Sequence, residues 1–348
     1  MLGHHVVKYL LESDEATSIT VFDVSTSSNR YYDSKVEYIT ESITSKNELI
    51  LALKRTNAKV IINTASPDPL VPISHLLEEV NIAGTQNVLD CAMECNIKIL
   101  FHTSSSEVVQ TSYNDIIMAN ETLPPHHGPV NGAVYSKTEK IGEELVLNAN
   151  GQIGLLTTAI RLCTLFGEED RVLTRHAIEM ARDGRAKHHI GTGKNLYDFI
   201  YAGNAAEGHV LAARKLLEAS RAEEPVPPEL RVDGEAFFIT NDEPWPFWGF
   251  TRFVASEVGR PIADEDTWII PLGVACFVVK ILEWIVWVRS WGRWLSVTGN
   301  ILRYTTQVRT FDIGKARKRL GYCPGVDMKE GIRRAVAWYL DEEQSLSS

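Results

Sequence analysis

The sequence predicts an α/β fold in which helices cover both faces of a parallel sheet. Helical and strand patterns alternate at short intervals through the first half of the 348 residues. The strand patterns are almost continuously apolar, as in Ile61-Ile62 and Leu100-Phe101, which is typical of strands buried on both faces. Polar residues follow these strands at their carboxyl ends, where such sheets bind ligands. Together these observations favour a doubly wound sheet with a ligand site along one edge.

The predicted elements of the first half follow from hydrophobic spacing. Apolar residues three and four positions apart predict helices, whereas short runs rich in β-branched and aromatic residues predict strands. The Ser66-Pro67 pair ends one of these strands. We predict helices at 4–11, 47–57, 75–95 and 137–148, and strands at 19–23, 60–65, 97–103 and 155–162.

The second half is predicted to be less regular. The glycines of 190–195 lack the spacing of a phosphate-binding loop, so they predict a turn. Residues 220–231 combine glutamates with several prolines and predict an exposed connector. The same spacing rules predict helices at 172–183, 205–219 and 327–340 and a strand at 197–201.

The start of the chain predicts an incomplete nucleotide-binding unit. Such a unit has a first strand, a glycine-rich turn and a helix whose N-terminus faces a pyrophosphate. This sequence begins at the helix, with Gly3 at the place of the last glycine of the turn. Asp23 ends the next strand, where an acid binds the hydroxyls of the adenosine ribose. We therefore expect a native chain with a further strand and turn ahead of Met1.

A strand and the helix after it predict an alcohol–ketone redox site. The strand runs into the hydroxyl cluster 103–106, and Tyr135 opens the helix. A tyrosine oxygen in this place exchanges a proton with the substrate, and the hydroxyl of Ser105 holds the substrate oxygen. Because tyrosine titrates at about pH 10, it needs a cation nearby, usually a lysine four residues on. That position is Glu139, whose ionised form disfavours the tyrosinate.

The apolar segment 268–294 is the second unusual stretch. Lys280 and Glu283 interrupt it, so the pattern is more broken than that of an ordinary transmembrane helix. Tryptophans such as Trp284 close to Arg289 suit a helix that lies in the headgroup region of a membrane. Two other interpretations stay open, a helix packed over a hydrophobic substrate pocket and a true membrane span.

Composition and charge narrow the possible functions. A net charge of -10 argues against non-specific nucleic-acid binding, which needs a basic surface. The five cysteines include no CxxC pair, so Cys91 and Cys95 are expected to be core thiols in reducing surroundings. The histidines, including His102 and His189, show no metal-ligand spacing and are predicted to lie in loops or on the surface. No metal site and no secretory signal are expected.

One set of sequence stretches runs along almost the whole chain, at residues 3–7, 63–69, 80–85, 103–109, 120–124, 159–161, 195–199, 203–206 and 311–312. No single motif among them is specific, but the set is. Together these stretches resemble the 3β-hydroxysteroid dehydrogenase family, within the extended short-chain dehydrogenase/reductases. The likeness is greatest to its sterol-4α-carboxylate 3-dehydrogenases.

The resemblance implies a role for each site residue. It implies a Rossmann-like NAD(P)-binding domain at 1–165 and a substrate-binding lobe at 166–348, interleaved with late strands of the Rossmann sheet. Ser105 would orient the substrate and Tyr135 would be the catalytic acid and base. The cofactor would be NAD, with NADP less favoured because of Asp23. The implied cofactor-binding positions are Gly3, Asp23, Ala65, Ser66, Asn81, Thr103, Tyr135 and Leu162.

The reaction that the resemblance implies is oxidation of the 3β-hydroxyl of a sterol, a sterol-4-carboxylate or a related triterpenoid. A 4-carboxylate would then be lost as CO2, because the product is a β-keto acid. The resemblance also implies an intracellular protein on the surface of the endoplasmic reticulum membrane, and it leaves a homodimer open.

Departures from the family pattern keep two alternatives open. Glu139 stands at the lysine position, Leu162 replaces a proline, and Ser42 stands where an aspartate near the adenine is common. The first alternative is a catalytically impaired member that binds sterol or partner proteins at a membrane. The second is a different reaction of the extended family, such as that of a sugar-nucleotide epimerase.

Overall fold

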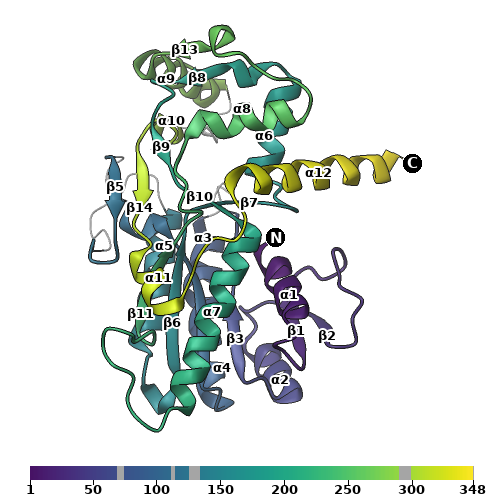
Figure 1. The fold of residues 1–348 in the computed structure, drawn as a ribbon, viewed down its shortest axis with the longest axis vertical. Helices are drawn as coiled ribbons and strands as arrows, with labels where there is room; N and C mark the ends of the chain where they lie inside the picture. The colour runs from purple at the N-terminus through teal and green to yellow at the C-terminus, as the bar shows by residue number, and fades with distance from the viewer. Residues whose placement is uncertain (69–73, 111–113, 125–133, 290–298, 348) are drawn as a thin grey trace.

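The computed structural model describes residues 1–68, 74–110, 114–124, 134–289 and 299–347 (Figure 1). A layered α/β part makes up the lower half of the view, and helices with short strands make up the upper half. The N-terminus lies near the level at which the two parts meet.

Four parallel strands form the sheet that carries the candidate site. In space their order is β11 (Glu235–Ile239), β6 (Leu156–Leu162), β4 (Ile99–Ser105) and β3 (Val60–Asn63). In the register of β4 and β6, Ser105 lies opposite Leu162, so these two strands end at the same edge. The predicted α/β class and parallel sheet are therefore confirmed.

A second, two-stranded parallel sheet lies beside the first. It consists of β1 (Ile19–Asp23) and β2 (Val36–Thr40), and Asp23 pairs with Thr40 at its carboxyl end. Among the described residues β3 hydrogen-bonds only to β4, and β1 only to β2. The expected single sheet is thus divided, because no described strand connects β1 and β3 by hydrogen bonds.

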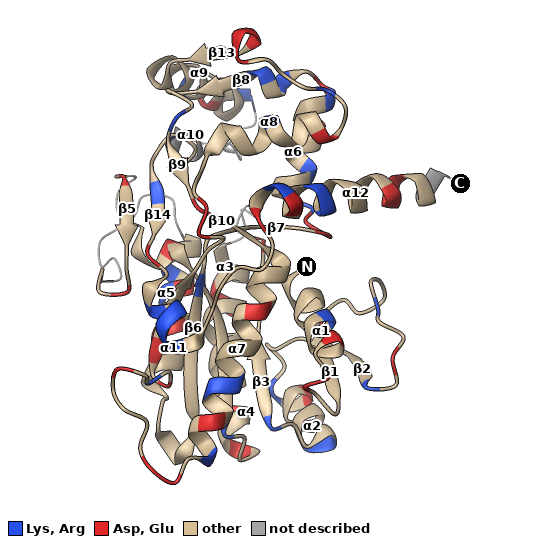
Figure 2. Cartoon of the chain, in the orientation of Figure 1, with Lys and Arg blue, Asp and Glu red and all other residues tan. Residues whose placement is uncertain are grey.

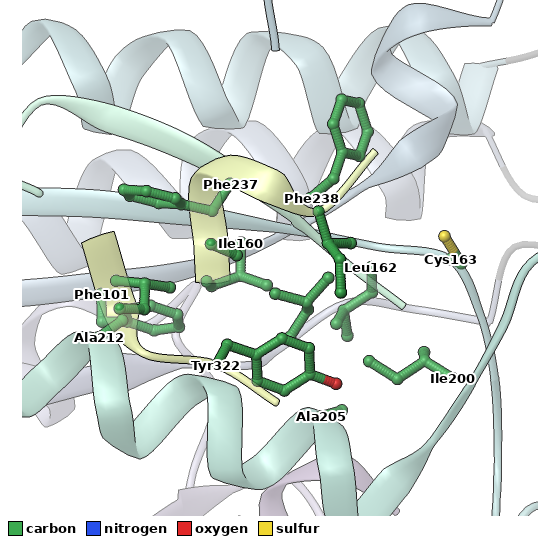
Figure 3. Close-up of a cluster of buried hydrophobic side chains, with 14 of the residues drawn as sticks. Phe101, Ile160, Leu162, Cys163, Ile200, Ala205, Ala212, Phe237, Phe238 and Tyr322 are labelled. Carbon is green, nitrogen blue, oxygen red and sulfur yellow. The ribbon is translucent and has the colours of Figure 1, made fainter. Parts of the chain in front are cut away.

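Helices cover both faces of the four-stranded sheet. Because successive side chains of a strand point to opposite faces, β4 contributes to two cores. Phe101 packs into the core that also holds Ile160 and Tyr322 (Figure 3), whereas Leu100 packs into the other. The first core includes residues of α1 (Leu2–Glu12) and α7 (Ala202–Arg221), and the second includes residues of α2 (Lys46–Thr56), α4 (Thr85–Glu94) and α5 (Val134–Asn148).

The predicted helix at 75–95 is a helical run with a π-helical centre. Its segments are α3 (Ser74–Leu77), η1 (Glu78–Gly84) and α4. Such π segments are frequent at functional sites, and this one carries Asn81 toward α5. Gly142 permits the close approach of the two helices, because a Cβ there would lie 2.7 Å from the carbonyl oxygen of Asn81.

The upper part is built around an aromatic core. Phe166 and Phe250 pack edge to face with ring centroids 5.2 Å apart. Three helices enclose this core, α6 (Leu173–Arg182), α8 (Phe247–Glu257) and α12 (Met328–Ser347). The predicted strand at 197–201 is two strands in different sheets, β9 (Leu196–Tyr197) and β10 (Phe199–Tyr201).

Most of the other short elements have no predicted counterpart. They include β5 (Ile116–Ala119), β7 (Thr164–Phe166), β8 (His188–Ile190), β12 (Trp245–Pro246), β14 (Arg309–Phe311), α10 (Gly299–Tyr304), α11 (Gly314–Leu320) and the 3-10 turns η2 (Ser106–Val109), η3 (Gln152–Gly154), η4 (Arg185–Lys187) and η5 (Asp264–Asp266). The late strand β11 joins the parallel sheet beside β6. The domain boundary after residue 165 stays a prediction.

The apolar segment forms β13 (Trp268–Ile270) and the helix α9 (Leu272–Arg289). Phe277 and Trp284 expose 65% and 66% of their surface, and Ala275 is the one buried residue of α9. Most of α9 is uncharged in Figure 2. Within the described residues, no helix has both the length and the apolar character that crossing a membrane requires. Residues 290–294 of the predicted segment lie outside the described residues.

Candidate active site

The candidate site lies where β3 and β4 end and α5 begins. Ser66 follows β3, Ser105 ends β4, and Tyr135 and Glu139 stand one turn apart on α5. Asn81 reaches the same place from the π segment η1. The structure therefore brings together five of the predicted site residues from four separate segments.

Glu139 is the buried centre of this group, with 4% of its surface exposed. Ser66 Oγ donates a hydrogen bond to Glu139 Oε1 over 2.9 Å, and Asn81 Nδ2 donates to the same oxygen over 3.0 Å. Burial and, to a smaller extent, the nearby Glu143 raise the pKa of Glu139, the hydrogen bond from Ser66 opposes this rise, and the net pKa is about 7. Glu139 therefore changes its charge near neutral pH.

Among the described residues, no cation stands beside Tyr135 to make this tyrosine acidic. Burial raises its pKa well above the ordinary value of 10.0, and the Glu139 carboxylate raises it further. Hydrogen bonding with Ser105 and Ser66 opposes this rise. Neither neighbouring lysine replaces the missing one, because Lys137 is exposed and Lys140 pairs with Glu144 over 3.5 Å. At neutral pH the residue is a phenol.

A buried ion pair between Arg161 and Glu143 holds the helix that carries Tyr135 and Glu139 against the sheet. Arg161 of β6 donates two hydrogen bonds to Glu143 of α5, over 2.9 and 2.7 Å. Ser104 Oγ donates a third, over 2.6 Å. Because the guanidinium and the carboxylate are both almost fully buried, each depends on the other for compensation of its charge. The pair fixes α5 to the centre of the sheet.

His102 corrects one sequence-based prediction. It was expected in a loop or on the surface, but it is buried in β4, and Asn63 Nδ2 lies 3.3 Å from its Nδ1. Burial lowers the pKa of His102 to about 4, so the ring is neutral. His189 is likewise buried, in β8. A neutral imidazole tolerates burial once a neighbouring amide hydrogen-bonds to it.

Glu107 is a site residue that the sequence analysis missed. Its backbone N–H donates to Ser105 Oγ over 3.2 Å, and its carboxylate accepts from Ser136 Oγ over 3.4 Å. The same carboxylate accepts from the Tyr304 hydroxyl over 2.7 Å and pairs with the buried Arg309 over 2.9 Å. Glu107 thus connects Ser105 and the first turn of α5 with α10 and β14. An acid directly after the hydroxyl cluster 103–106 was the one sequence signal for it.

The remaining predicted cofactor residues are spread along the edge of the two sheets. A Cβ on Gly3 would lie 3.3 Å from Thr64 Oγ1, so α1 starts close to the end of β3. Asp23 is exposed at the end of β1, and Ala65 follows β3. Thr103 Oγ1 lies 2.8 Å from His209 Nε2, on the face that α7 covers. Leu162 is buried in the core of Figure 3. Their roles toward a cofactor stay predictions.

Comparison with known protein families identifies one that matches most of the chain. Residues 1–272 match the 3-beta hydroxysteroid dehydrogenase/isomerase family. The chain is 32% identical to the decarboxylating sterol-4-alpha-carboxylate 3-dehydrogenase of Saccharomyces cerevisiae, and the match covers 98% of this chain and 95% of the yeast protein. It is 33% identical to the human protein of that description, over 96% of this chain and 84% of the human one.

A plant relative is longer. The chain is 35% identical to 3beta-hydroxysteroid-dehydrogenase/decarboxylase isoform 2 of Arabidopsis thaliana, over 87% of this chain. The chain spans about half of that protein, since the match covers 52% of it.

Solved structures share the fold at low sequence identity. UDP-glucose 4-epimerase of Thermotoga maritima superposes with a TM-score of 0.70 at 17% identity, covering 99% of this chain and 96% of the epimerase. The dTDP-glucose 4,6-dehydratase of Bacillus anthracis, solved in complex with NAD, gives a TM-score of 0.69 at 17% identity, covering 99% and 94%. At this identity the likeness concerns the fold alone.

Proposed function

The chain belongs to the 3-beta hydroxysteroid dehydrogenase/isomerase family, and from that premise we propose that it oxidises the 3β-hydroxyl of a sterol or related triterpenoid with NAD. The observation that carries the proposal is the placing of Tyr135 and Ser105 beside each other at the carboxyl end of β4. Sterol-4-carboxylates are the proposed substrates, because relatives that match almost the whole chain carry that activity in their names.

A nicotinamide dinucleotide fits the residues that are present. The start of α1 lies close to the end of β3, where Gly3 leaves room for a close approach. The exposed carboxylate of Asp23 suits the ribose hydroxyls of the adenosine half and disfavours the added phosphate of NADP. When bound, the nicotinamide supplies a hydride acceptor.

The residues of the chain would orient the substrate and move its proton. Ser105 holds the 3β-hydroxyl oxygen, and Tyr135 Oη accepts the hydroxyl proton as the ketone forms. Glu107 keeps Ser105 and the first turn of α5 in place. A 4-carboxylate next to the new ketone is a β-keto acid and leaves as CO2 without further help from the protein.

We also propose a further parallel strand between β1 and β3. Its support is that neither strand has a described hydrogen-bonding partner on the side that faces the other. A strand there would join the two parallel sheets into the predicted doubly wound one.

The proposed function is tested by binding and by turnover. Isothermal titration should detect NAD binding, more tightly when a strand and a glycine-rich turn are added ahead of α1. Incubation with a 3β-hydroxysterol-4-carboxylate and NAD should release NADH, the 3-ketone and CO2 in equal amounts. Binding of UDP-sugars without any turnover of sterols would favour the epimerase alternative. Sterol binding without NAD binding in either form would favour the catalytically impaired alternative.

We further propose that α9 attaches the protein to the surface of a membrane, that of the endoplasmic reticulum. Its support is the exposed apolar face of the helix, which includes Val274, Phe277, Ile281, Trp284 and Val288 at helical spacing. A soluble protein rarely leaves an apolar surface of this extent uncovered.

Charged residues on that face should release the protein from lipid. The double variant Phe277→Glu and Trp284→Glu is expected no longer to float with phospholipid vesicles in a density gradient. Both side chains lie on one side of α9, so the variant places two charges on the face that would contact lipid. Leu51→Glu is the matched control, since Leu51 is an equally exposed apolar residue on α2. Equal flotation of the double variant and the control contradicts the membrane proposal.

A further inference from the structure

We propose that Glu139 accepts the phenol proton of Tyr135 while Tyr135 takes the proton of the substrate hydroxyl. The pair would then work as a phenol and a carboxylate, in place of a tyrosinate stabilised by a lysine. This inference rests on the proposed function and assigns a task to the residue that departs most from the family pattern.

The two hydrogen bonds that Glu139 accepts from Ser66 and Asn81 both end on Oε1, so Oε2 is the proposed proton acceptor. Ser66 Oγ and Asn81 Nδ2 both donate to Oε1, which holds the carboxylate in one orientation. Residues four apart share one face of a helix, so Tyr135 and Glu139 face the same way from α5. Oε2 is therefore the oxygen that can accept a proton from Tyr135 Oη. A hydrogen bond with Tyr135 also lowers the pKa of Glu139, which agrees with contact between the two.

The two pKa values set the resting protonation state of the pair. With the pKa of Tyr135 well above 10.0 and that of Glu139 at about 7, the proton lies on the phenol and the carboxylate is ionised at pH 8. A phenol cannot take the substrate proton unless it gives up its own, and Glu139 is the adjacent base.

Within the part of the chain that the structure describes, the other charged groups around Glu139 are compensated or exposed. Glu143 on α5 pairs with Arg161 of β6, and Glu107 of η2 pairs with Arg309. The buried His102 of β4 is neutral at this pH. The groups on the remaining neighbouring elements are the exposed His75 of α3, Glu78 and Glu79 of η1, and Asp90 of α4, which pairs with Lys46.

The atoms and electrons of the step balance. The substrate O–H bond breaks as its proton moves to Tyr135 Oη. At the same time the original O–H bond of Tyr135 breaks, and the phenol's own proton moves to Glu139 Oε2. The C3–H bond supplies the electron pair that leaves as hydride to a nicotinamide-class acceptor, and the C3–O bond becomes the carbonyl.

A titration without cofactor or substrate tests the contact first. Infrared difference spectra should show a protonated carboxyl group that titrates at about pH 7 and is absent from Glu139→Gln. In Tyr135→Phe the midpoint should move upward, because the carboxylate loses a hydrogen-bond donor. Tyr322→Phe is the matched control, since the hydroxyl of this buried tyrosine bonds to the carbonyl oxygen of Thr240, away from the site. An unchanged midpoint in Tyr135→Phe overturns the inference, whatever the enzyme oxidises.

The pH dependence of sterol oxidation tests the task itself. In the native chain kcat/KM should rise through about pH 7 as Glu139 ionises. Glu139→Gln should lower kcat/KM by roughly 10²-fold or more and remove that rise. A Glu139→Gln variant that keeps both the rate and the rise overturns the inference while the proposed function stands. Absence of oxidation by every form, Glu139→Lys included, overturns the proposed function and this inference together.

Discussion

Replacing Tyr135 with phenylalanine is expected to lower kcat by roughly 10²- to 10⁴-fold, the range for loss of a general acid or base. The phenol is the group next to Ser105 that can exchange a proton with the substrate oxygen. Removal of one hydroxyl leaves the packing of α5 intact, so any change in the affinity for NAD reports the part of Tyr135 in cofactor binding and should be far smaller than the change in kcat. Steady-state kinetics with a sterol-4-carboxylate, together with isothermal titration of NAD, measure the two quantities separately.

The control for this variant is again Tyr322→Phe. Tyr322 is buried in the core of Figure 3, and its hydroxyl has one hydrogen bond to a backbone carbonyl. Its variant should keep the native kcat within a small factor and lose some stability. If Tyr135→Phe turns over sterols as fast as Tyr322→Phe, another group exchanges the proton and the proposed role of Tyr135 is wrong.

Replacing Glu143 with alanine is expected to cost about 3–5 kcal/mol of unfolding free energy. The change leaves the guanidinium of Arg161 in the protein interior without its carboxylate, and 4% of that side chain is exposed. Ser104 Oγ also loses its acceptor. Urea unfolding followed by circular dichroism should show a lower midpoint with an unchanged slope.

The neighbouring residue offers a matched control. Glu144→Ala removes the same side chain from the same helix, but Glu144 exposes 44% of its side chain and pairs with Lys140 across one turn at 3.5 Å. Such pairs contribute about 0.3–0.5 kcal/mol. The double variant Glu143→Leu with Arg161→Met should recover much of the loss, because it removes both charges. A loss in Glu143→Ala no greater than in Glu144→Ala contradicts this account of the ion pair.

Local pattern predicted the parts of the molecule that depend on neighbours in the chain. The strands that end at Asp23 and close to Ser105, and the helix that carries Tyr135 and Glu139, follow from spacing within a dozen residues. The spacing of apolar residues and the length of apolar runs indicate whether a segment is a helix or a strand, because the backbone geometry of each repeats every few residues. The resemblance to the family was likewise inferred from short motifs, each made of residues that are close together in the sequence.

Two local predictions failed, the exposure of His102 and the single strand at 197–201. His102 lies in a strand that was predicted, but a lone histidine gives no signal of whether an amide such as that of Asn63 will compensate its burial. The strand at 197–201 divides at Asp198 between two sheets, and both halves look alike in sequence. In both cases the outcome depended on residues far away in the sequence, an amide that hydrogen-bonds to the histidine and the strands that pair with β9 and β10, and not on the local propensity of the segment.

The tertiary structure alone decided what surrounds the reactive groups. Glu107 bonds to Tyr304 and Arg309 from almost the other end of the chain, and Glu139 bonds to Ser66 and Asn81 from segments far before it. Hydrogen bonds and burial depend on distances in space, which separation along the chain does not encode. The sequence by itself determined which residues stand at the reactive positions, and the folded chain determined that Glu139 is buried and bonded so as to ionise near neutral pH.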